Sequence, residues 1–134
     1  MPIIVVLDTN ILTVPAQFSV DIFAESERVL EGRVEFIVLR SVIQELEKKL
    51  DVVARTEKFK FRVALDLIDR CTIIESDEFS SSSLVDDQVL EYAIAVNGVV
   101  ATNDRDLRER AIQERVPVIF LRGKKRLELI GTTR

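Results

Sequence analysis

The sequence contains no histidine and only one cysteine, and both shortages restrict its chemistry. Without histidine, Ser-His-Asp catalysis, Cys-His catalysis and an imidazole acid or base are excluded. The usual zinc ligand sets are also unavailable, and Cys71 cannot form an internal disulfide. If the protein is an enzyme, its chemistry must come from carboxylates, hydroxyls, lysine, arginine or a hard cation.

Long apolar runs are lacking as well. No stretch approaches the roughly 18 apolar residues of a membrane span, and the first residues do not follow the basic, apolar and small-residue order of a signal peptide. We therefore expect no membrane partner and a cytoplasmic location. The 134 residues, 47% of them hydrophobic, are expected to form one domain, residues 1–134, with a normal core.

Positive charge is not in excess, because 19 lysines and arginines stand against 23 aspartates and glutamates. The net charge of −4 argues against a nucleic-acid binder that relies on overall charge, but it leaves room for a local basic surface.

Short apolar segments alternate with amphipathic segments along the chain. Five strands are expected, at Ile3–Leu7, Val34–Leu39, Thr72–Glu75, Val99–Thr102 and Val116–Leu121. Helices are expected from Ser19 to Leu30, from Ser41 to at least Leu50, from Arg55 to Arg70, from Ser83 to Asn97 and from Arg105 to Glu114. This order implies βαβ units and a doubly wound α/β fold, with helices on both faces of a parallel sheet and the first strand in its middle.

Serines mark several of the predicted boundaries. Ser19 is expected to cap the first helix, and Ser41 with Gln44 has the spacing of a capping box at the start of the second. The segment Ser76–Ser83 contains four consecutive serines and predicts a mobile loop.

The first predicted strand ends abruptly in Asp8, Thr9 and Asn10. In open α/β sheets, ligands bind at the edge formed by the carboxyl ends of the strands. The alternative is that these residues only begin a turn, because Asp, Thr and Asn side chains bond their own backbone.

Further acidic residues lie where a predicted strand ends and the next helix begins. Glu45 is in the first turns of the second predicted helix, Asp86 and Asp87 open the fourth, and Asp104 follows the fourth strand. These acids should therefore meet at one edge of the sheet. Their structural alternatives are ion pairs or helix caps: Glu45 with Lys48 or Lys49, Asp86 with Ser83, and Asp104 and Asp106 at a helix start.

Several carboxylates at one edge need compensation. Two carboxylates about 4 Å apart repel by roughly 4 kcal/mol at an effective dielectric of about 20. The group must therefore bind a cation or take up protons. Because the chain offers oxygen ligands but no histidine and no thiolate cluster, the pattern favours Mg²⁺ or Mn²⁺.

Four segments, taken in order, resemble the motifs of the PIN-domain nucleases along nearly the whole chain. They are Val6–Asn10, Val42–Leu46, Val85–Leu90 with Ala93, and Ala101–Leu107. The ending Val116–Arg122 is similar to the branch that contains ribosomal-RNA processing PIN proteins and their archaeal relatives, while VapC-type toxins share the same four motifs.

The resemblance implies a three-layer α/β/α fold with a central, mainly parallel five-stranded sheet. It also implies Mg²⁺- or Mn²⁺-dependent cleavage of RNA phosphodiester bonds. The catalytic, metal-binding acids would be Asp8, Glu45, Asp86 and Asp104, and the polar residues that hold them or a water would be Thr9, Asn10 and Thr102.

Two ligand positions stay open. Asp87 could replace Asp86, although the seven-residue step from Asp86 to Ala93 fits the family pattern better. Asp106 could supplement Asp104, but its spacing from Asn103 also suits a helix cap.

RNA must reach these acids past their negative charge. Candidate phosphate contacts are the basic residues near the motifs and in a predicted basic turn: Arg40, Lys48, Lys49, Arg105, Arg108, Arg122, Lys124, Lys125 and Arg126. For each one the alternative is a solvated surface charge, and the turn from Arg122 to Arg126 stands out because four of its five positions are basic.

The main hypothesis is therefore a metal-dependent ribonuclease with RNA as its partner, an endonuclease by resemblance, acting in ribosomal-RNA processing. The alternatives are a VapC-type toxin with an antitoxin partner and a non-catalytic RNA-binding or assembly module. A homodimer and a ribosome-assembly partner are further expectations from the resemblance.

Overall fold

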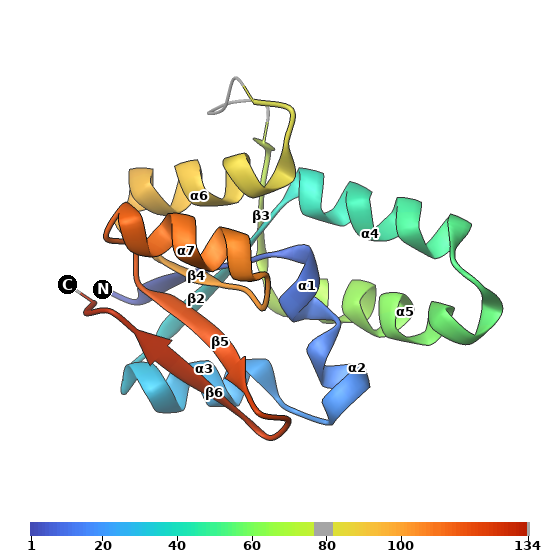
Figure 1. Ribbon diagram of the computed structural model, residues 1–134, viewed down its shortest axis with the longest axis horizontal. Coiled ribbons are helices and arrows are strands. Elements are labelled where there is room, and N and C mark those ends of the chain that lie inside the picture. The colour runs from blue at the N-terminus through green and yellow to red at the C-terminus, as the bar shows by residue number, and fades with distance from the viewer. Residues whose placement is uncertain (77–81, 134) are drawn as a thin grey trace.

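The computed structural model describes residues 1–76 and 82–133, so most of the predicted serine loop lies outside the described residues. The sheet has the strand order β3-β2-β1-β4-β5-β6 (Figure 1). Its strands are β1 Ile3–Leu7, β2 Val34–Leu39, β3 Thr72–Ile74, β4 Val99–Ala101, β5 Val118–Arg122 and β6 Arg126–Ile130. The first five pair in parallel, and β1 lies in the middle of the sheet as predicted, between β2 and β4.

Within the described residues the sheet has six strands, so the predicted number of five is wrong. β6 pairs antiparallel with β5, and the expected basic turn is the turn of this hairpin. Gly123 begins the turn at a φ of 64°, a left-handed conformation that glycine adopts without strain. Beyond the turn, Leu127 is buried under α3, Ile22–Leu30.

The helices are α1 Thr9–Leu12, α2 Val14–Phe18, α3 Ile22–Leu30, α4 Arg40–Val52, α5 Lys58–Leu67, α6 Val85–Val96 and α7 Arg105–Gln113. The longer helices, α3 to α7, match the predicted segments in place but not at every boundary. Single turns of 3-10 helix at Arg55–Glu57 and Ile68–Arg70 flank α5. α1 and α2 were not predicted, because each covers little more than one turn.

Helices cover both faces of the sheet. Figure 1 shows α6 and α7 on one side and α3 on the other, which confirms the predicted three-layer α/β/α arrangement. α4 extends away from the sheet edge and α5 returns beside it. Within residues 1–76 and 82–133, no helix is long and apolar enough to span a bilayer.

Two predicted serine caps are wrong. Ser19 ends α2 in a left-handed conformation, and Asp21 caps α3 by accepting the N–H groups of Phe23 and Ala24 at 3.0 Å. α4 begins at Arg40 and has no side-chain cap.

The predicted capping box at Ser41 is replaced by a contact from far along the chain. The Ser41 N–H donates to the Ser76 hydroxyl oxygen at 2.9 Å, and the Ser76 hydroxyl donates to the Ser41 side chain at 3.0 Å. A local serine pattern cannot reveal such a partner.

Candidate active site

The strand order places a topological switch point between β1 and β4. From β1 the chain moves outward through β2 to β3, and it then returns through α6 to β4 on the other side of β1. In open α/β sheets this arrangement opens a crevice at the carboxyl ends of the two strands. Asp8 directly follows β1, and Asp104 comes shortly after β4, so both residues lie at this crevice.

The Asp8 side chain is buried, and both of its carboxylate oxygens accept hydrogen bonds. One carboxylate oxygen accepts the N–H of Ile11 at 2.7 Å and thereby caps α1, and the other accepts the hydroxyl of Thr102. Its own N–H donates to the carbonyl of Ala101 at 3.1 Å. The predicted turn is therefore confirmed, and the same capping bond fixes the carboxylate at the crevice, where the predicted site would lie.

Thr102 joins two acidic residues. It is fully buried, its hydroxyl donates to Asp8, and its oxygen accepts the N–H of Asp104 at 2.9 Å. Asp104 in turn caps α7 by accepting the N–H of Leu107 at 3.0 Å. The cap suggested for Asn103 and Asp106 is wrong, since the Asn103 side chain accepts the N–H of Leu121 instead.

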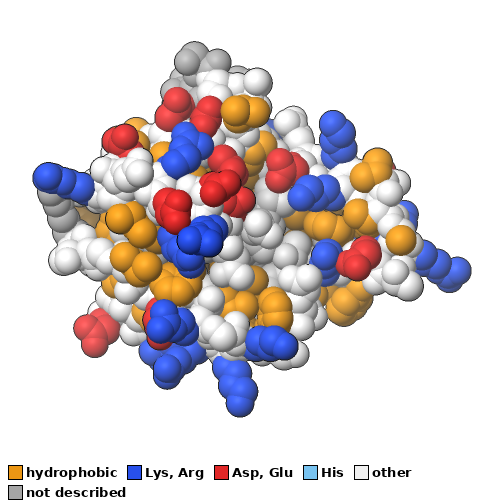
Figure 2. All heavy atoms as spheres, in the orientation of Figure 1, with side chains coloured by type: hydrophobic (Ala, Val, Ile, Leu, Met, Phe, Trp, Pro, Cys, Tyr) orange, Lys and Arg blue, Asp and Glu red, His pale blue; other side chains and the backbone are white. Residues whose placement is uncertain are grey.

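A cavity of about 360 Å³ opens above this edge. Its lining brings together the four acids predicted from separate segments, namely Asp8, Glu45, Asp86 and Asp104. Thr9 and Asn10 line it as well, and so does Asp87. Figure 2 shows acidic side chains gathered near the centre of this face of the molecule.

The carboxylates at the cavity raise one another's pKa values through their charges. Burial raises the pKa of Asp8 from 3.8 to about 7, with a further contribution from the charges of Asp86 and Asp104 and a partial offset from the bonds of Thr102 and Ile11. Burial also raises the pKa of Asp86, and the charges of Asp104 and Glu45 add to it. The cavity thus stabilises protons or a cation on its acids.

The pKa values of the neighbouring residues Asp86 and Asp87 are shifted in opposite directions. Asp87 accepts the Ser82 hydroxyl at 2.7 Å and the guanidinium of Arg110 at 2.7 Å, and these bonds lower its pKa. Asp86 is half-buried and feels the charges of the other acids. The capping box proposed for Asp86 with Ser83 is wrong, because α6 begins after Leu84 without a side-chain cap.

Asp106 is not brought into the group. It is exposed in the first turn of α7 and is not among the described residues that line the cavity. Glu45 makes no ion pair with Lys48 or Lys49 among the described residues, so its alternative interpretation is not supported.

The chemistry of the donors fits a hard divalent cation. The acids offer only oxygen, and the buried hydroxyl oxygen of Thr9 at the same cavity has no hydrogen-bond partner among the described residues. In the described part of the chain, no three acidic or cysteine side chains stand in a geometry that could hold a metal ion by themselves. A site of this kind would need waters to complete the coordination, as Mg²⁺ sites commonly do.

The basic residues near the site have different environments. Arg105 pairs with Glu109 at 3.3 Å, Arg108 lies over the ring of Phe120 at 4.9 Å, and Arg40 pairs with Glu75 at 3.0 Å. At the hairpin, Arg122 and Arg126 lie 3.7 and 4.0 Å from Glu128, while Lys124 and Lys125 are exposed in the turn.

Among the described residues, the cationic side chains that line the acidic cavity itself are Lys49 and Arg110. The sequence pattern named Lys49 but missed Arg110, whose position depends on how α6 and α7 pack together.

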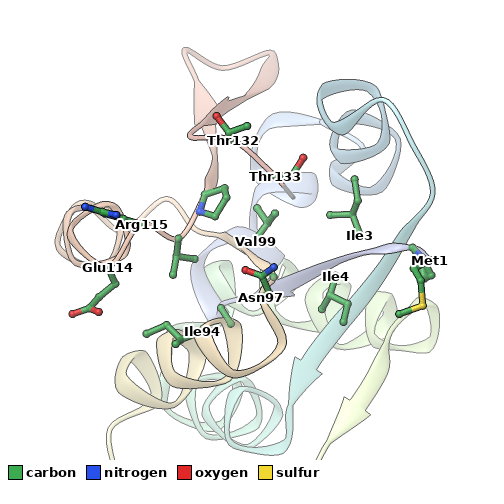
Figure 3. Close-up of a pocket in the computed structure, with 15 residues that line it drawn as sticks. Met1, Ile3, Ile4, Ile94, Asn97, Val99, Glu114, Arg115, Thr132 and Thr133 are labelled. Atoms are coloured by element: carbon green, nitrogen blue, oxygen red, sulfur yellow. The ribbon is translucent and has the colours of Figure 1, made fainter.

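A second cavity, of about 340 Å³, lies at the opposite edge of the sheet. Figure 3 shows it between the start of β1 and the ends of α6 and α7. Glu114 is the only carboxylate among its described lining residues, so it lacks the acid group of the first cavity. The group of carboxylates therefore lies at the switch-point edge.

The fold and the site define a doubly wound α/β/α protein with an acidic, all-oxygen site at its switch point. The chain belongs to the family described as "PIN like domain", which it matches over residues 5–124. This confirms the family that the four motifs indicated.

Two archaeal proteins are similar to the chain over most of its length. Ribonuclease VapC4 of Methanocaldococcus jannaschii is 30% identical over 131 residues, which cover 95% of this chain and 96% of that protein. Ribonuclease VapC9 of Archaeoglobus fulgidus is 30% identical over 122 residues, covering 91% and 85%.

Solved structures share the fold. The structure described as that of the PIN domain endonuclease Utp24 aligns with a TM-score of 0.80 at 20% identity, covering 98% of this chain and 94% of that one. The Rickettsia felis VapBC2 complex aligns with a TM-score of 0.58 at 20% identity, covering 81% and 92%. At these identities the likeness shows the fold alone.

Proposed function

We propose that this PIN-domain protein is a divalent-metal-dependent ribonuclease that cuts RNA phosphodiester bonds internally. The observation that carries the proposal is the meeting of four acids, from four separate segments, at one cavity on the switch-point edge. The two archaeal relatives that match most of the chain are named ribonucleases, which adds support. We further propose that residues 1–134 are one such domain, acting in the cytoplasm.

Asp8, Glu45, Asp86 and Asp104 would hold Mg²⁺ or Mn²⁺. Such an ion lowers the pKa of a bound water and stabilises charge on the phosphate. Thr102 keeps the Asp8 carboxylate in place by donating to it, and it links Asp8 to the start of α7. Thr9 and Asn10 would orient a water or the substrate with the polar atoms that they present at the cavity.

Two biological settings are compatible with this chemistry. We propose ribosomal-RNA processing as the first, supported by the ending Val116–Arg122, which is similar to that of ribosomal-RNA processing PIN proteins. The fold shared with the Utp24 endonuclease supports internal cleavage. The second is a VapC-type toxin with an antitoxin partner, supported by the names of the archaeal relatives and by the VapBC complex of similar fold. A homodimer and a ribosome-assembly partner remain predictions in either setting.

Cleavage of labelled RNA tests the proposal. Purified protein is incubated with a single-stranded RNA and a hairpin RNA, with Mn²⁺, with Mg²⁺ or with chelator. We expect metal-dependent internal cuts that Asp8→Asn abolishes and that Asp106→Asn leaves intact, because Asp106 lies outside the cavity lining. No cutting under any condition would instead favour the non-catalytic RNA-binding or assembly module.

A further inference from the structure

Arg110 is the basic residue of α7 that faces the acidic cavity. Among the described basic side chains of this helix, Arg105 pairs with Glu109 and Arg108 packs on Phe120, whereas Arg110 lines the cavity. Helical side chains lean toward the N-terminus of their helix. The long side chain of Arg110 therefore extends along α7 toward Asp104 and the switch-point edge.

Asp87 fixes the guanidinium of Arg110. One oxygen of Asp87 accepts from Arg110 at 2.7 Å, and the other accepts the hydroxyl of Ser82 at 2.7 Å. Asp87 belongs to the first turn of α6, so the pair spans from one helix to the next. A guanidinium has five N–H donors, and the bond to Asp87 uses one of them.

A phosphate that enters this cavity meets strong repulsion. The lining contains four acids besides Asp87, and one divalent cation offsets only two negative charges. Additional positive charge near the phosphate therefore favours binding. A guanidinium suits this purpose because its planar donors match phosphate oxygens and it stays protonated.

We propose that Arg110 binds a phosphate of the RNA at the acidic cavity, and that Asp87 is the positioning residue that holds Arg110 there rather than a metal ligand. The inference rests on the proposed ribonuclease function. It assigns different tasks to two adjacent acids, since Asp86 serves the metal and Asp87 serves the arginine.

A purely structural role for the pair makes different predictions. The Arg110 and Asp87 side chains are 46% and 27% exposed, and an ion pair this exposed contributes little to folding. A residue that only tied α6 to α7 would leave RNA affinity and its salt dependence unchanged. A residue that contacts phosphate alters both, because each contact releases a counterion.

The test measures binding of a fluorescein-labelled single-stranded RNA by anisotropy, in chelator so that no cleavage occurs, over a range of salt. The variants are Arg110→Ala and Arg110→Lys, with Arg33→Ala as the matched control because Arg33 is exposed at the opposite edge of the sheet. We expect Arg110→Ala to weaken RNA binding about tenfold and to reduce the slope of log affinity against log salt by about 0.7. Arg110→Lys should lie in between, and Arg33→Ala should match the wild type.

Two further readouts separate this contact from a loss of structure. Mn²⁺ affinity, measured by calorimetry, should be retained or increased in Arg110→Ala, because a positive charge has left the cavity. Asp87→Asn should keep Mn²⁺ binding but weaken RNA binding and lower its salt slope, by less than Arg110→Ala does, because the guanidinium is present but no longer held.

The outcomes are distinct. If the wild type cuts RNA and Arg110→Ala binds it as tightly as Arg33→Ala, with the same salt slope, the inference is wrong and the ribonuclease function stands. If Arg110→Ala loses Mn²⁺ binding together with RNA binding, the role of Arg110 is structural. If the wild type neither binds nor cuts RNA, the inference and the proposed function fail together.

Discussion

Asp8 is a buried carboxylate, so the ionised form that would bind a metal ion destabilises the metal-free fold. It is 3% exposed, and its pKa of about 7 means that its ionised form is costly in the absence of a cation. The bonds from Ile11 and Thr102 offset this cost only in part. A buried carboxylate kept under these conditions is typical of a functional site, because most folds would avoid it.

Asp8→Asn should therefore stabilise the metal-free protein at alkaline pH. The folded-state pKa of Asp8 is raised from 3.8 to about 7, so the folded protein holds this proton more tightly than the unfolded chain does. The stability linked to this group is full at low pH and is lost as pH rises through the interval between these two values. Chemical denaturation in chelator should show Asp8→Asn more stable by about 1 to 3 kcal/mol at pH 8. An amide has no charge to bury, but it offers one acceptor oxygen where the carboxylate offers two, so it loses one of the two bonds from Ile11 and Thr102.

At pH 5 this advantage should shrink, since the wild-type carboxylate is then mostly protonated. Asp87→Asn is the matched control and should give no stabilisation at pH 8, because Ser82 and Arg110 favour the ionised form of Asp87. An Asp8→Asn protein that is less stable than the wild type at pH 8 would show that burial does not penalise this carboxylate.

Among the elements, the β5–β6 hairpin extends the site along the edge of the sheet. β5 runs parallel to β4, so its carboxyl end and the following turn emerge on the same side as Asp8 and Asp104. Neighbouring strands lie about 4.8 Å apart, which puts Ile119 of β5 roughly 10 Å from Leu7 at the end of β1, and β5 continues past that level to Arg122. Figure 2 shows basic side chains on the same face as the acidic group, which suits a path for the RNA backbone.

Lys124 and Lys125 should carry most of the hairpin's attraction for RNA. Arg122 and Arg126 already lie near Glu128, whereas both lysines are exposed and make no ion pair among the described residues. Replacing both lysines by glutamine should weaken RNA binding and lower its salt slope by about 1.4, at about 0.7 for each contact on a single strand.

The control for this prediction removes the same charge elsewhere. Arg33 and Arg115 are exposed at the amino-terminal edge of the sheet, so the double change to glutamine there should leave the slope unchanged. Equal salt slopes of RNA binding for the two double variants would mean that the hairpin does not contact phosphate. Mn²⁺ binding should be the same in both variants.

For the whole molecule, the sequence could predict whatever depends on short-range pattern and sheet geometry. The alternation of apolar and amphipathic segments predicts a parallel sheet with β1 in its middle, and strand ends then place Asp8, Asp86 and Asp104 at one edge. Sequence spacing could not separate Asp86 from Asp87, because two adjacent residues differ only in which side of α6 they occupy.

What the pattern missed depends on contacts between distant segments. Arg110 meets Asp87 only because α6 and α7 pack against each other, and Ser41 meets Ser76 because β3 ends beside the start of α4. β6 did leave a local signal, since Leu127 and Leu129 alternate with polar residues after Gly123. That signal was masked by the charge of the adjoining turn.

Calorimetric titration with Mn²⁺ of the wild type, Asp86→Asn and Asp87→Asn at pH 8 tests the central claim, that one edge of the sheet forms a carboxylate metal site. Each variant removes one negative charge, and the two positions are adjacent on α6, so the two variants have the same net charge. We predict that Asp86→Asn weakens Mn²⁺ binding by at least about tenfold, while Asp87→Asn stays within about threefold of the wild type. Equal affinities in all three proteins, or no binding by the wild type, would contradict the metal site.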